Sequence, residues 1–192
     1  MCKELHIEAL FFIMKGKILV SSPSLLSDTI FNKSVILIVD KRRDGITGFI
    51  LNKTGGFLFT KNKNNSSSKK YEFGFGGPVS DETFYLLKSE KIHEESIRID
   101  HNYYWGNDVQ LIINQIENGK INKENVIFFQ GYSGWDEQQL DYEIENKSWI
   151  IIDKFDRDIF RFKEKNCWNK IISEIGDKYR IWSNSPEDIS LN

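Results

Sequence analysis

The chain has 192 residues, of which 40% are hydrophobic and 14% aromatic, so it has enough apolar material for the core of one folded domain. Its 26 basic and 28 acidic side chains give a net charge of -2, which excludes an overall basic field that would attract nucleic acid or an anionic membrane. Cys2 and Cys167 are too few for a disulfide framework, and the early apolar run Ala9–Met14 is too short to span a bilayer and lacks a cleavage site. We therefore expect a cytoplasmic protein with no membrane association.

Strand patterns dominate the first half of the chain, after an N-terminal extension that we place at residues 1–15. Asp44-Gly45 between two apolar runs predicts a hairpin, and Gly48 in the return strand indicates a bulge or a close backbone approach. Residues 61–70 hold no apolar side chain and predict a mobile surface loop. The expected strands cover residues 16–23, 33–39, 46–53, 71–75 and 83–87. Gly76-Gly77-Pro78 predicts a turn that makes the last two antiparallel partners.

Helical patterns enter between strands in the second half. Alternating residues 94–100 predict a strand, and Asn107 or Asp108 is placed to cap a helix that Gly119 ends. Strands are expected at 126–129 and 149–152, and a last helix at 164–175 with Gly176 as its stop. This order predicts an α+β fold with a mostly antiparallel, curved sheet. One domain, residues 16–176, would be followed by a polar tail, residues 177–192.

The stretch Val126–Ile144 is the expected centre of the fold. A buried strand is followed by a turn bracketed by Gly131 and Gly134, and then by an amphipathic helix. Ser133 stands three residues before an acid, the spacing of a helix N-cap with a first-turn carboxylate. We expect Trp135 at the mouth of this helix, either as a core residue or as an apolar wall of a binding site.

Ser133 is also the candidate nucleophile of a hydrolase or transferase, because Gly131–Trp135 imitates a nucleophile elbow. That motif needs glycine where this chain has Trp135, and an activated serine needs a histidine base. His93 and His101 are the histidines of the expected domain, and neither has a triad context. The capping role of Ser133 is therefore favoured, with the enzyme as the alternative.

Other chemistry has weaker signals in the sequence. His93, Glu94, Glu95 and the Asp100-His101 pair lack the spacing of a metal site, and no phosphate-loop or dinucleotide motif predicts a cofactor. Cys167 on an apolar helix face indicates packing more than thiol chemistry. Basic residues 41–43 and the 61–70 loop could touch phosphates, but no nucleic-acid-binding motif accompanies them, so a nucleic-acid partner is not supported.

An ordered set of short motifs resembles the AlgH/YqgE family of largely uncharacterised bacterial proteins. The motifs run from Gly16 to Gly176 and are Ser22-Pro23, Phe31-Asn32-Lys33-Ser34-Val35, Asp44-Gly45, Gly48, Asn52-Lys53, Gly76-Gly77-Pro78-Val79, Gly131-Tyr132-Ser133-Gly134-Trp135, Gln139-Leu140, Glu143, Trp149, Trp168 and Ile175-Gly176. The resemblance implies a branched sheet that curls into a pseudo-barrel with helices packed outside. It also implies a role in transcriptional regulation, without an established reaction or DNA-binding element.

Because no catalytic set is complete, we expect a non-catalytic binding or regulatory module with an unidentified protein or small-molecule partner. The expected site assumes that several strand-end turns meet in space. Its residues are Asn52, Lys53, Gly76, Gly77, Tyr132, Ser133 and Trp135.

Overall fold

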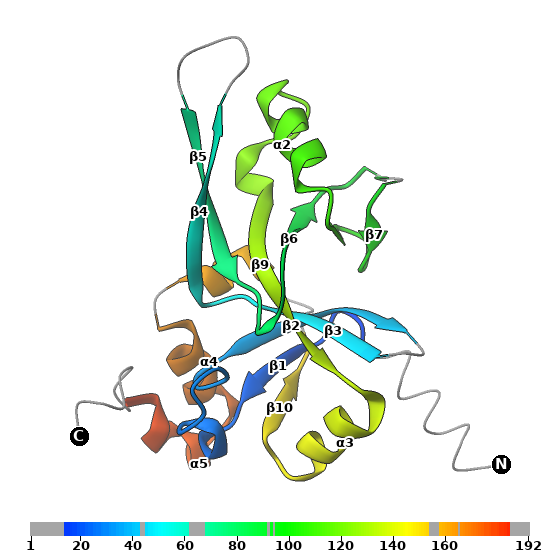
Figure 1. The fold of residues 1–192 in the computed structure, drawn as a ribbon. Helices are drawn as coiled ribbons and strands as arrows, with labels where there is room; N and C mark the ends of the chain where they lie inside the picture. The colour runs from blue at the N-terminus through cyan, green and yellow to red at the C-terminus, as the bar shows by residue number, and fades with distance from the viewer. Residues whose placement is uncertain are drawn as a thin grey trace, which may run out of the picture.

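The computed structural model describes residues 14–42, 45–61, 68–91, 93, 95–153, 158–164 and 166–184. Within them, one branched sheet is covered by helices at its two ends and along one side (Figure 1). The strands are β1 (Ile18–Ser21), β2 (Val35–Arg42), β3 (Gly45–Ile50), β4 (Thr54–Lys61), β5 (Ser68–Phe75), β6 (Val79–Lys88), β7 (Ile97–Arg98), β8 (Tyr103–Gly106), β9 (Val126–Trp135) and β10 (Trp149–Ile152). The helices are α2 (Val109–Glu117), α3 (Glu137–Glu145), α4 (Cys167–Ile175) and α5 (Asp177–Arg180), and short 3-10 turns lie at Pro23–Leu25, Lys123–Asn125, Ile159–Lys163 and Ile181–Asn184.

The strands follow the order β10-β1-β2-β3-β9-β6-β8-β7, and β4 and β5 branch from β9 as a two-stranded arm. Every pairing is antiparallel except that of β5 with β9. The α+β class and the mostly antiparallel, branched sheet are therefore confirmed. The strand path ends at β10 and at β7, so this sheet does not close into a hydrogen-bonded barrel.

Strand β9 is the element at which the sheet branches. Along one edge it pairs with β6, from Val126 to Tyr132. Along the other edge it pairs first with β5, at Phe128–Gln130, and then with β3, at Ser133–Trp135. We call the part of the sheet with β4 to β8 the upper sheet and the part with β1, β2, β3 and β10 the lower sheet. The first half of β9 belongs to the upper sheet, and its last three residues belong to the lower sheet.

Three glycines make this change of partner possible, and we call Gly76, Gly77 and Gly131 the glycine junction. A Cβ on Gly76 would lie 2.2 Å from Gly131 O, and one on Gly131 would lie 2.4 Å from Gly77 O. A Cβ on Gly77 would lie 2.3 Å from the carbonyl carbon of Tyr132, and the φ of Gly77 is +150°. Two backbone segments therefore touch at a separation that no side chain permits.

The predicted turn and helix cap around Ser133 are wrong. β9 continues through Gly131, which takes a φ of 67° within the strand, and runs on to Trp135 because β3 offers a new partner. The helix begins three residues later than a cap at Ser133 would place it, and Asp136 is the N-cap, whose carboxylate accepts from Gln139 N at 2.7 Å. Serine and aspartate both cap helices well, so sequence spacing alone did not separate the two residues.

The predicted pairing of residues 71–75 with 83–87 is also wrong. Segment 71–75 belongs to β5, whose antiparallel partner is β4, while segment 83–87 belongs to β6 and pairs with β8 and β9. The glycine turn between them does not close a hairpin, because β9 enters between β5 and β6. A local turn signal cannot reveal β9, which comes from residues 126–135, far along the chain from this turn.

Several local predictions are confirmed. Asp108 caps α2 by accepting from Leu111 N at 2.9 Å, and Gly119 follows the helix with a φ of 69°. Gly48 lies in a close approach, since a Cβ there would be 2.7 Å from a methyl group of Ile36. The strand expected at 94–100 is reduced to β7, Ile97–Arg98.

Other predictions lie outside the described residues, in whole or in part. These are residues 1–13 of the extension at 1–15, residues 62–67 of the loop at 61–70, Asp44 of the hairpin, and residues 185–192 of the tail. No helix of the described ranges has the length and hydrophobicity needed to cross a membrane.

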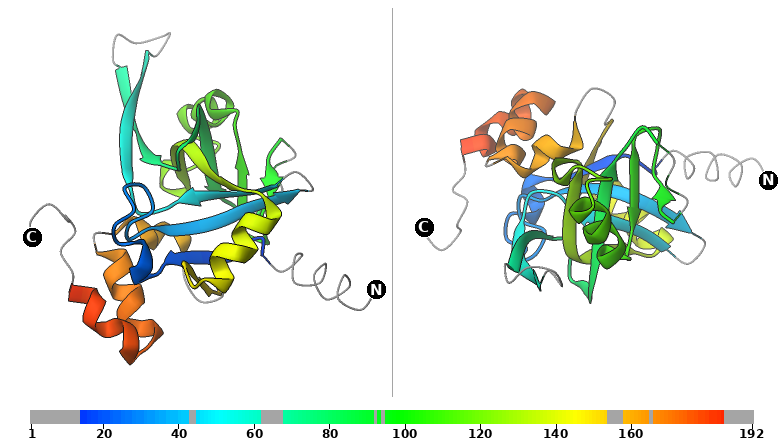
Figure 2. Two further views of the ribbon diagram at one scale, coloured as in Figure 1. Left: turned by 60° about the horizontal axis from the view of Figure 1, so that its bottom comes forward. Right: turned by 90° about the horizontal axis from the view of Figure 1, so that it is seen from above.

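Each of the three longer helices covers its own hydrophobic cluster. α2 packs over the upper sheet with Tyr85 and Phe128, and α4 packs with Leu37 and Phe49 in the largest cluster. α3 covers a third cluster that contains Ile36. Because Ile36 and Leu37 are neighbours on β2, α3 and α4 lie against opposite faces of the lower sheet, as Figure 2 also shows.

Candidate functional site

The seven residues expected to share one patch occupy three places. Two line a polar cavity beside α4, two line a second cavity at the end of β9, and three lie between these cavities in or next to the glycine junction. In this order they are Asn52 and Lys53, then Tyr132 and Trp135, then Gly76, Gly77 and Ser133. The turns do meet in space, but backbone fills their meeting point and a cavity lies on each side.

Ser133 is part of the framework at this meeting point. Its side chain is fully buried, and its hydroxyl donates to Gly76 O at 3.1 Å. The same carbonyl accepts from Ile50 N at 3.0 Å, so β3, β9 and the end of β5 are tied at one atom. His93 lies within 3.0 Å of the hydroxyl of Ser89 and His101 within 3.2 Å of Arg98, so the contacts of these histidines lie elsewhere.

The first cavity, which we call the lysine cavity, has a volume of about 460 Å³. It lies between the β3–β4 connection, the segment before β2, and the N-terminus of α4. Its lining residues are Asn32, Lys33, Asn52, Lys53, Thr54, Lys163, Glu164, Asn166, Cys167, Trp168 and Asn169. Three of these are lysines, while the carboxylate of Glu164 is bound to Lys170 at 2.9 Å. The cavity is therefore polar and has an excess of positive charge.

Asn52 shapes the wall of the lysine cavity. Its side-chain oxygen accepts from Val35 N at 2.9 Å, and its side-chain nitrogen donates to Lys33 O at 2.8 Å. These bonds hold Lys33 in a left-handed conformation, with a φ of 49°. Asn166, on the opposite wall, also has a positive φ of 61°. Such conformations are uncommon for residues other than glycine and often accompany binding sites.

Lys53 lines this cavity, and its ammonium group is held by a neighbouring turn. Its Nζ donates to Ile30 O, in a turn that Asp28 shapes by accepting from Ile30 N at 2.7 Å and Phe31 N at 2.6 Å. Burial lowers the pKa of Lys53 below its ordinary value of 10.5, and the charge of Asp28 opposes this shift. The lowered pKa means that the surroundings solvate this cation poorly.

Lys33 and Lys163 complete the basic lining, and the sequence did not single out either of them. Lys33 is only 8% exposed, and its Nζ lies 5.4 Å from the centroid of the Trp168 ring. Burial lowers the pKa of Lys163, and the negative charges of Glu72 and Glu124 oppose this shift. Because the side chain of Lys163 is exposed, water screens this effect. The lowered pKa of Lys53 is therefore the stronger indication of a poorly solvated cation. Lys33 does lie in a family motif, whereas no sequence signal pointed to Lys163.

The second cavity, which we call the aromatic cavity, has a volume of about 470 Å³ and lies where the last residues of β9 pair with β3, beside the irregular part of the β6–β9 pairing. Its lining residues are Asp40, Arg42, Gly45, Ile46, Thr47, Val79, Glu82, Phe84, Trp105, Tyr132, Gly134, Trp135 and Asp136. The rings of Tyr132 and Phe84 meet edge to face at 5.7 Å, and Trp105 lies 6.2 Å from Phe84. Three rings therefore form a continuous apolar wall.

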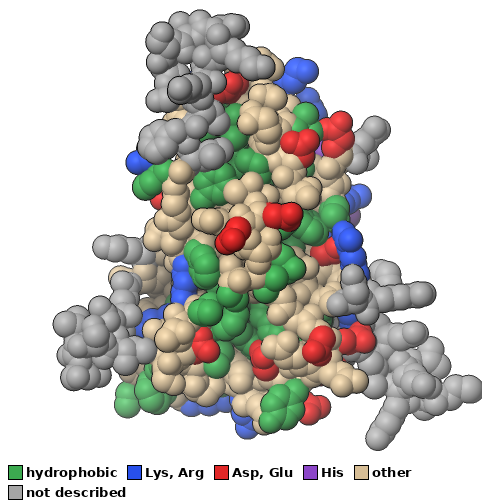
Figure 3. Space-filling model, in the orientation of Figure 1, with side chains coloured by type: hydrophobic (Ala, Val, Ile, Leu, Met, Phe, Trp, Pro, Cys, Tyr) green, Lys and Arg blue, Asp and Glu red, His purple; other side chains and the backbone are tan. Residues whose placement is uncertain are grey.

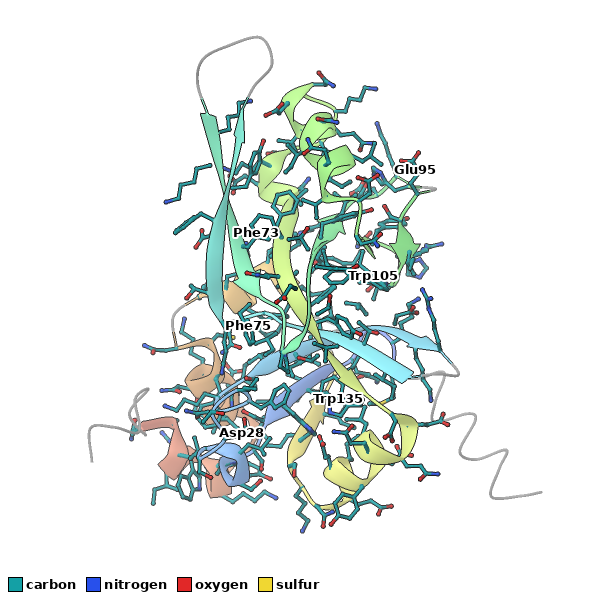
Figure 4. All side chains as sticks on the ribbon, in the orientation of Figure 1. Asp28, Phe73, Phe75, Glu95, Trp105 and Trp135 are labelled. Atoms are coloured by element: carbon teal, nitrogen blue, oxygen red, sulfur yellow. The ribbon has the colours of Figure 1, made fainter. Side chains whose placement is uncertain are left out.

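Trp135 belongs mainly to the core beneath this cavity. It is 4% exposed, and its Nε1 donates to Glu143 at 3.0 Å. Its ring contacts Trp149 edge to face at 5.9 Å. In Figure 4, Trp135 and Trp105 lie on opposite sides of the β2–β3 ribbon. The burial and contacts of the Trp135 ring therefore fit its expected role as a core residue.

The remaining sequence candidates have structural roles. Lys41 pairs with Glu137 at 3.2 Å and Arg42 with Asp40 at 2.7 Å, while Arg43 is outside the described residues. Cys167 is buried at the start of α4. Within the described ranges, no group of three or more histidine, cysteine, aspartate or glutamate residues is arranged to hold a metal ion.

Comparison with known proteins now identifies the family. A family model described as AlgH-like matches residues 18–180. The chain belongs to the AlgH-like family. The resemblance seen in the ordered motifs is thereby confirmed. Among AlgH-like relatives, a UPF0301 protein of Cytophaga hutchinsonii is 36% identical over 182 residues, which cover 94% of this chain and 100% of the relative. A UPF0301 protein of Bacteroides fragilis is 32% identical over 186 residues, which cover 93% of this chain and 91% of the relative.

Two solved structures share the AlgH-like fold. The crystal structure of protein DIP2367 from Corynebacterium diphtheriae aligns with a TM-score of 0.67 at 18% identity, covering 92% of this chain and 97% of that one. The solution structure of AlgH from Pseudomonas aeruginosa aligns with a TM-score of 0.66 at 17% identity, covering 91% and 95%. At these identities the likeness concerns the fold, so the site must be argued from this chain's own residues.

Proposed function

We propose that this AlgH-like protein is a non-catalytic binding module and that its lysine cavity binds a small anion carrying phosphate or carboxylate groups. The observation that carries the proposal is Lys53, which has a lowered pKa and lines a cavity together with two further lysines. An anion placed there would restore the solvation that burial removes from this cation.

The start of α4 adds to the same electrostatic field. The first backbone N–H groups of a helix point outward and favour negative charge. Asn166, the N-cap residue of α4, makes no side-chain hydrogen bond to these groups, although Cys167 N already donates to Glu164 O at 3.1 Å, so an anion would meet the N–H groups that follow. The bound anion would therefore meet ammonium groups from one side and helix N–H groups from the other.

Catalysis by Ser133 has less support. A nucleophilic serine must be reached by substrate and activated by a base, whereas Ser133 is fully buried and its hydroxyl already donates to Gly76 O. Transcriptional regulation is implied by the family name, and binding of an anionic effector is compatible with such a role.

Titration calorimetry with inorganic pyrophosphate at about 0.1 M salt tests the proposal. We expect Lys53→Met to weaken binding by about tenfold or more, because a hydrogen bond to a charged group contributes about 1.5–3 kcal/mol. Lys91→Met is the matched control, since it removes the same charge from the exposed β6–β7 connection. Equal affinity of the wild type and Lys53→Met, or an equal loss in both variants, would contradict a specific site.

A second readout separates ligand binding from general charge attraction. An anion that contacts Lys53 should raise its pKa, so binding should take up protons at alkaline pH, where the free lysine is partly deprotonated. Calorimetry in two buffers of different ionisation enthalpy measures this uptake. It should be larger in the wild type than in Lys53→Met, where Lys163 is the remaining lysine of the cavity with a lowered pKa.

A further inference from the structure

Trp105 carries the least satisfied polar group of the aromatic cavity. Its side chain lines the cavity and is 8% exposed. Its Nε1 is buried and has no hydrogen-bond partner among the described residues. By contrast, Nε1 of Trp135 and of Trp149 both donate to Glu143, and Nε1 of Trp168 donates to Ser21 O. A buried indole N–H without an acceptor is uncommon and indicates a place for one.

The walls around Trp105 are suited to an apolar body. The rings of Tyr132, Phe84 and Trp105 follow one another, and Val79 at the rim is 37% exposed. These side chains come from three neighbouring strands, β9, β6 and β8, so the wall is fixed by sheet pairing. Such a wall favours a flat or chain-like apolar group, and its ring faces attract a cation.

The charges of the aromatic cavity are mainly negative. Asp40, Glu82 and Asp136 line it together with a single cation, Arg42. Asp40 is already paired, with Arg42 at 2.7 Å and with Lys15 at 3.5 Å. Glu82 and Asp136 lie at the exposed mouth and give it an excess of negative charge. This sign is opposite to that of the lysine cavity, so the two cavities suit different ligands.

We propose that the aromatic cavity binds an organic cation that has an apolar body and a hydrogen-bond acceptor, as an arginine or lysine side chain with its neighbouring amide has. The cation would lie at the ring faces near Glu82 and Asp136, and the acceptor would take the hydrogen bond that Trp105 Nε1 offers. This inference rests on the aromatic cavity alone and is independent of the anion proposed for the lysine cavity.

The test uses NMR with Nα-acetyl-L-arginine methylamide as the probe, and its uncharged isostere, Nα-acetyl-L-citrulline methylamide, as the control. The indole N–H signal of Trp105 is identified by its loss in Trp105→Phe. We expect the arginine probe to shift this signal in a saturable way and to bind about tenfold or more tightly than the citrulline probe. An unmoved Trp105 signal, or equal binding of the two probes, would overturn the proposal.

Two variants separate the hydrogen bond from the charge. Trp105→Phe keeps a ring and should weaken the arginine probe by about threefold to tenfold, with Tyr132 signals reporting the binding. Glu82→Gln should weaken the arginine probe and leave the citrulline probe unchanged, whereas the exposed Glu90→Gln should alter neither. Unchanged arginine affinity in both Trp105→Phe and Glu82→Gln would show that the probe binds elsewhere.

A final comparison distinguishes the source of the cation. Free spermidine offers positive charge and methylene groups but no amide carbonyl. Binding that shifts the Trp105 indole with the arginine probe and not with spermidine would indicate a peptide side chain as the natural ligand. Equal shifts with both would overturn the proposed hydrogen bond, because spermidine has no acceptor for the indole N–H.

Discussion

The lysine cavity and the aromatic cavity lie on either side of one glycine junction, yet they leave different groups unsatisfied. In the lysine cavity the positive charge of Lys53 is poorly solvated, as its lowered pKa indicates, and two further lysines line the same cavity. In the aromatic cavity Asp40 and Arg42 are paired, and the unsatisfied group is the neutral Nε1–H of Trp105. If both proposals hold, one branched sheet presents two sites that bind ligands of opposite charge.

The surroundings of the two cavities also differ in how their elements are held. The lysine cavity depends on connections and helix ends, whereas the aromatic cavity is built on paired strands. Figure 3 shows a group of hydrophobic side chains in the lower middle of this face, with acidic side chains both above and below it. Substitutions at the junction should disturb both cavities, and substitutions at their separate supports should disturb one each.

The largest effect is expected for Gly77→Ala. The added Cβ would lie 2.3 Å from backbone of Tyr132, and the residue would keep a φ of +150°, so we expect a loss of about 3 kcal/mol or more in the free energy of unfolding. Urea denaturation measures this loss, and both ligand sites should weaken together. Gly56→Ala is the control, because its Cβ would meet no atom within 4 Å.

The next effect concerns the aromatic side alone. Glu143 accepts from the indoles of Trp135 at 3.0 Å and Trp149 at 2.6 Å, so Glu143→Ala leaves two partly buried N–H groups without an acceptor. We expect a loss of about 2 kcal/mol in thermal or urea unfolding. Glu143→Gln, which retains an acceptor, should lose less, and the exposed Glu145→Ala should be near neutral. Equal losses for Glu143→Ala and Glu145→Ala would refute this role.

The smallest effect concerns the support of the lysine cavity. Burial raises the pKa of Asp158, but hydrogen bonds from Lys88, the Phe160 N–H and Tyr103 outweigh burial and hold that pKa below its usual 3.8. Burial, with the nearby Asp158 carboxylate, in turn raises the pKa of Tyr103 to about 12. These bonds anchor the turn at 159–163 that carries Lys163.

Asp158→Asn should therefore lower stability at neutral pH by about 1 kcal/mol or less, because the carboxylate is partly exposed. A lowered folded-state pKa means that the stabilisation is complete above the unfolded-state pKa and is lost as the pH falls through the folded-state value. The difference from the wild type should shrink as the pH falls below 3.8 and disappear below the folded-state pKa of Asp158, whereas the exposed Asp81→Asn should show no such pH dependence. A constant difference at all pH values would contradict the ionic origin.

Much of the fold could be predicted from local patterns. The cap at Asp108 and the stop at Gly119 follow from side-chain capping chemistry, and the inward stripe of α4 follows from its periodicity. The family resemblance implied a branched sheet, but the position of the branch at β9 could not be predicted, because it depends on a partner change at Gly131 that no local signal encodes. The separation of Lys53 from Tyr132 could not be predicted either, since it results from backbone filling the glycine junction.

The ionisation of Lys53 tests the central claim most directly. NMR titration of its side-chain CH₂ signals, assigned through Lys53→Met, gives its pKa with and without saturating pyrophosphate. We predict a pKa below 10.5 in the free protein and a higher pKa in the presence of pyrophosphate. An ordinary pKa in the free protein that pyrophosphate leaves unchanged would contradict the proposed anion site.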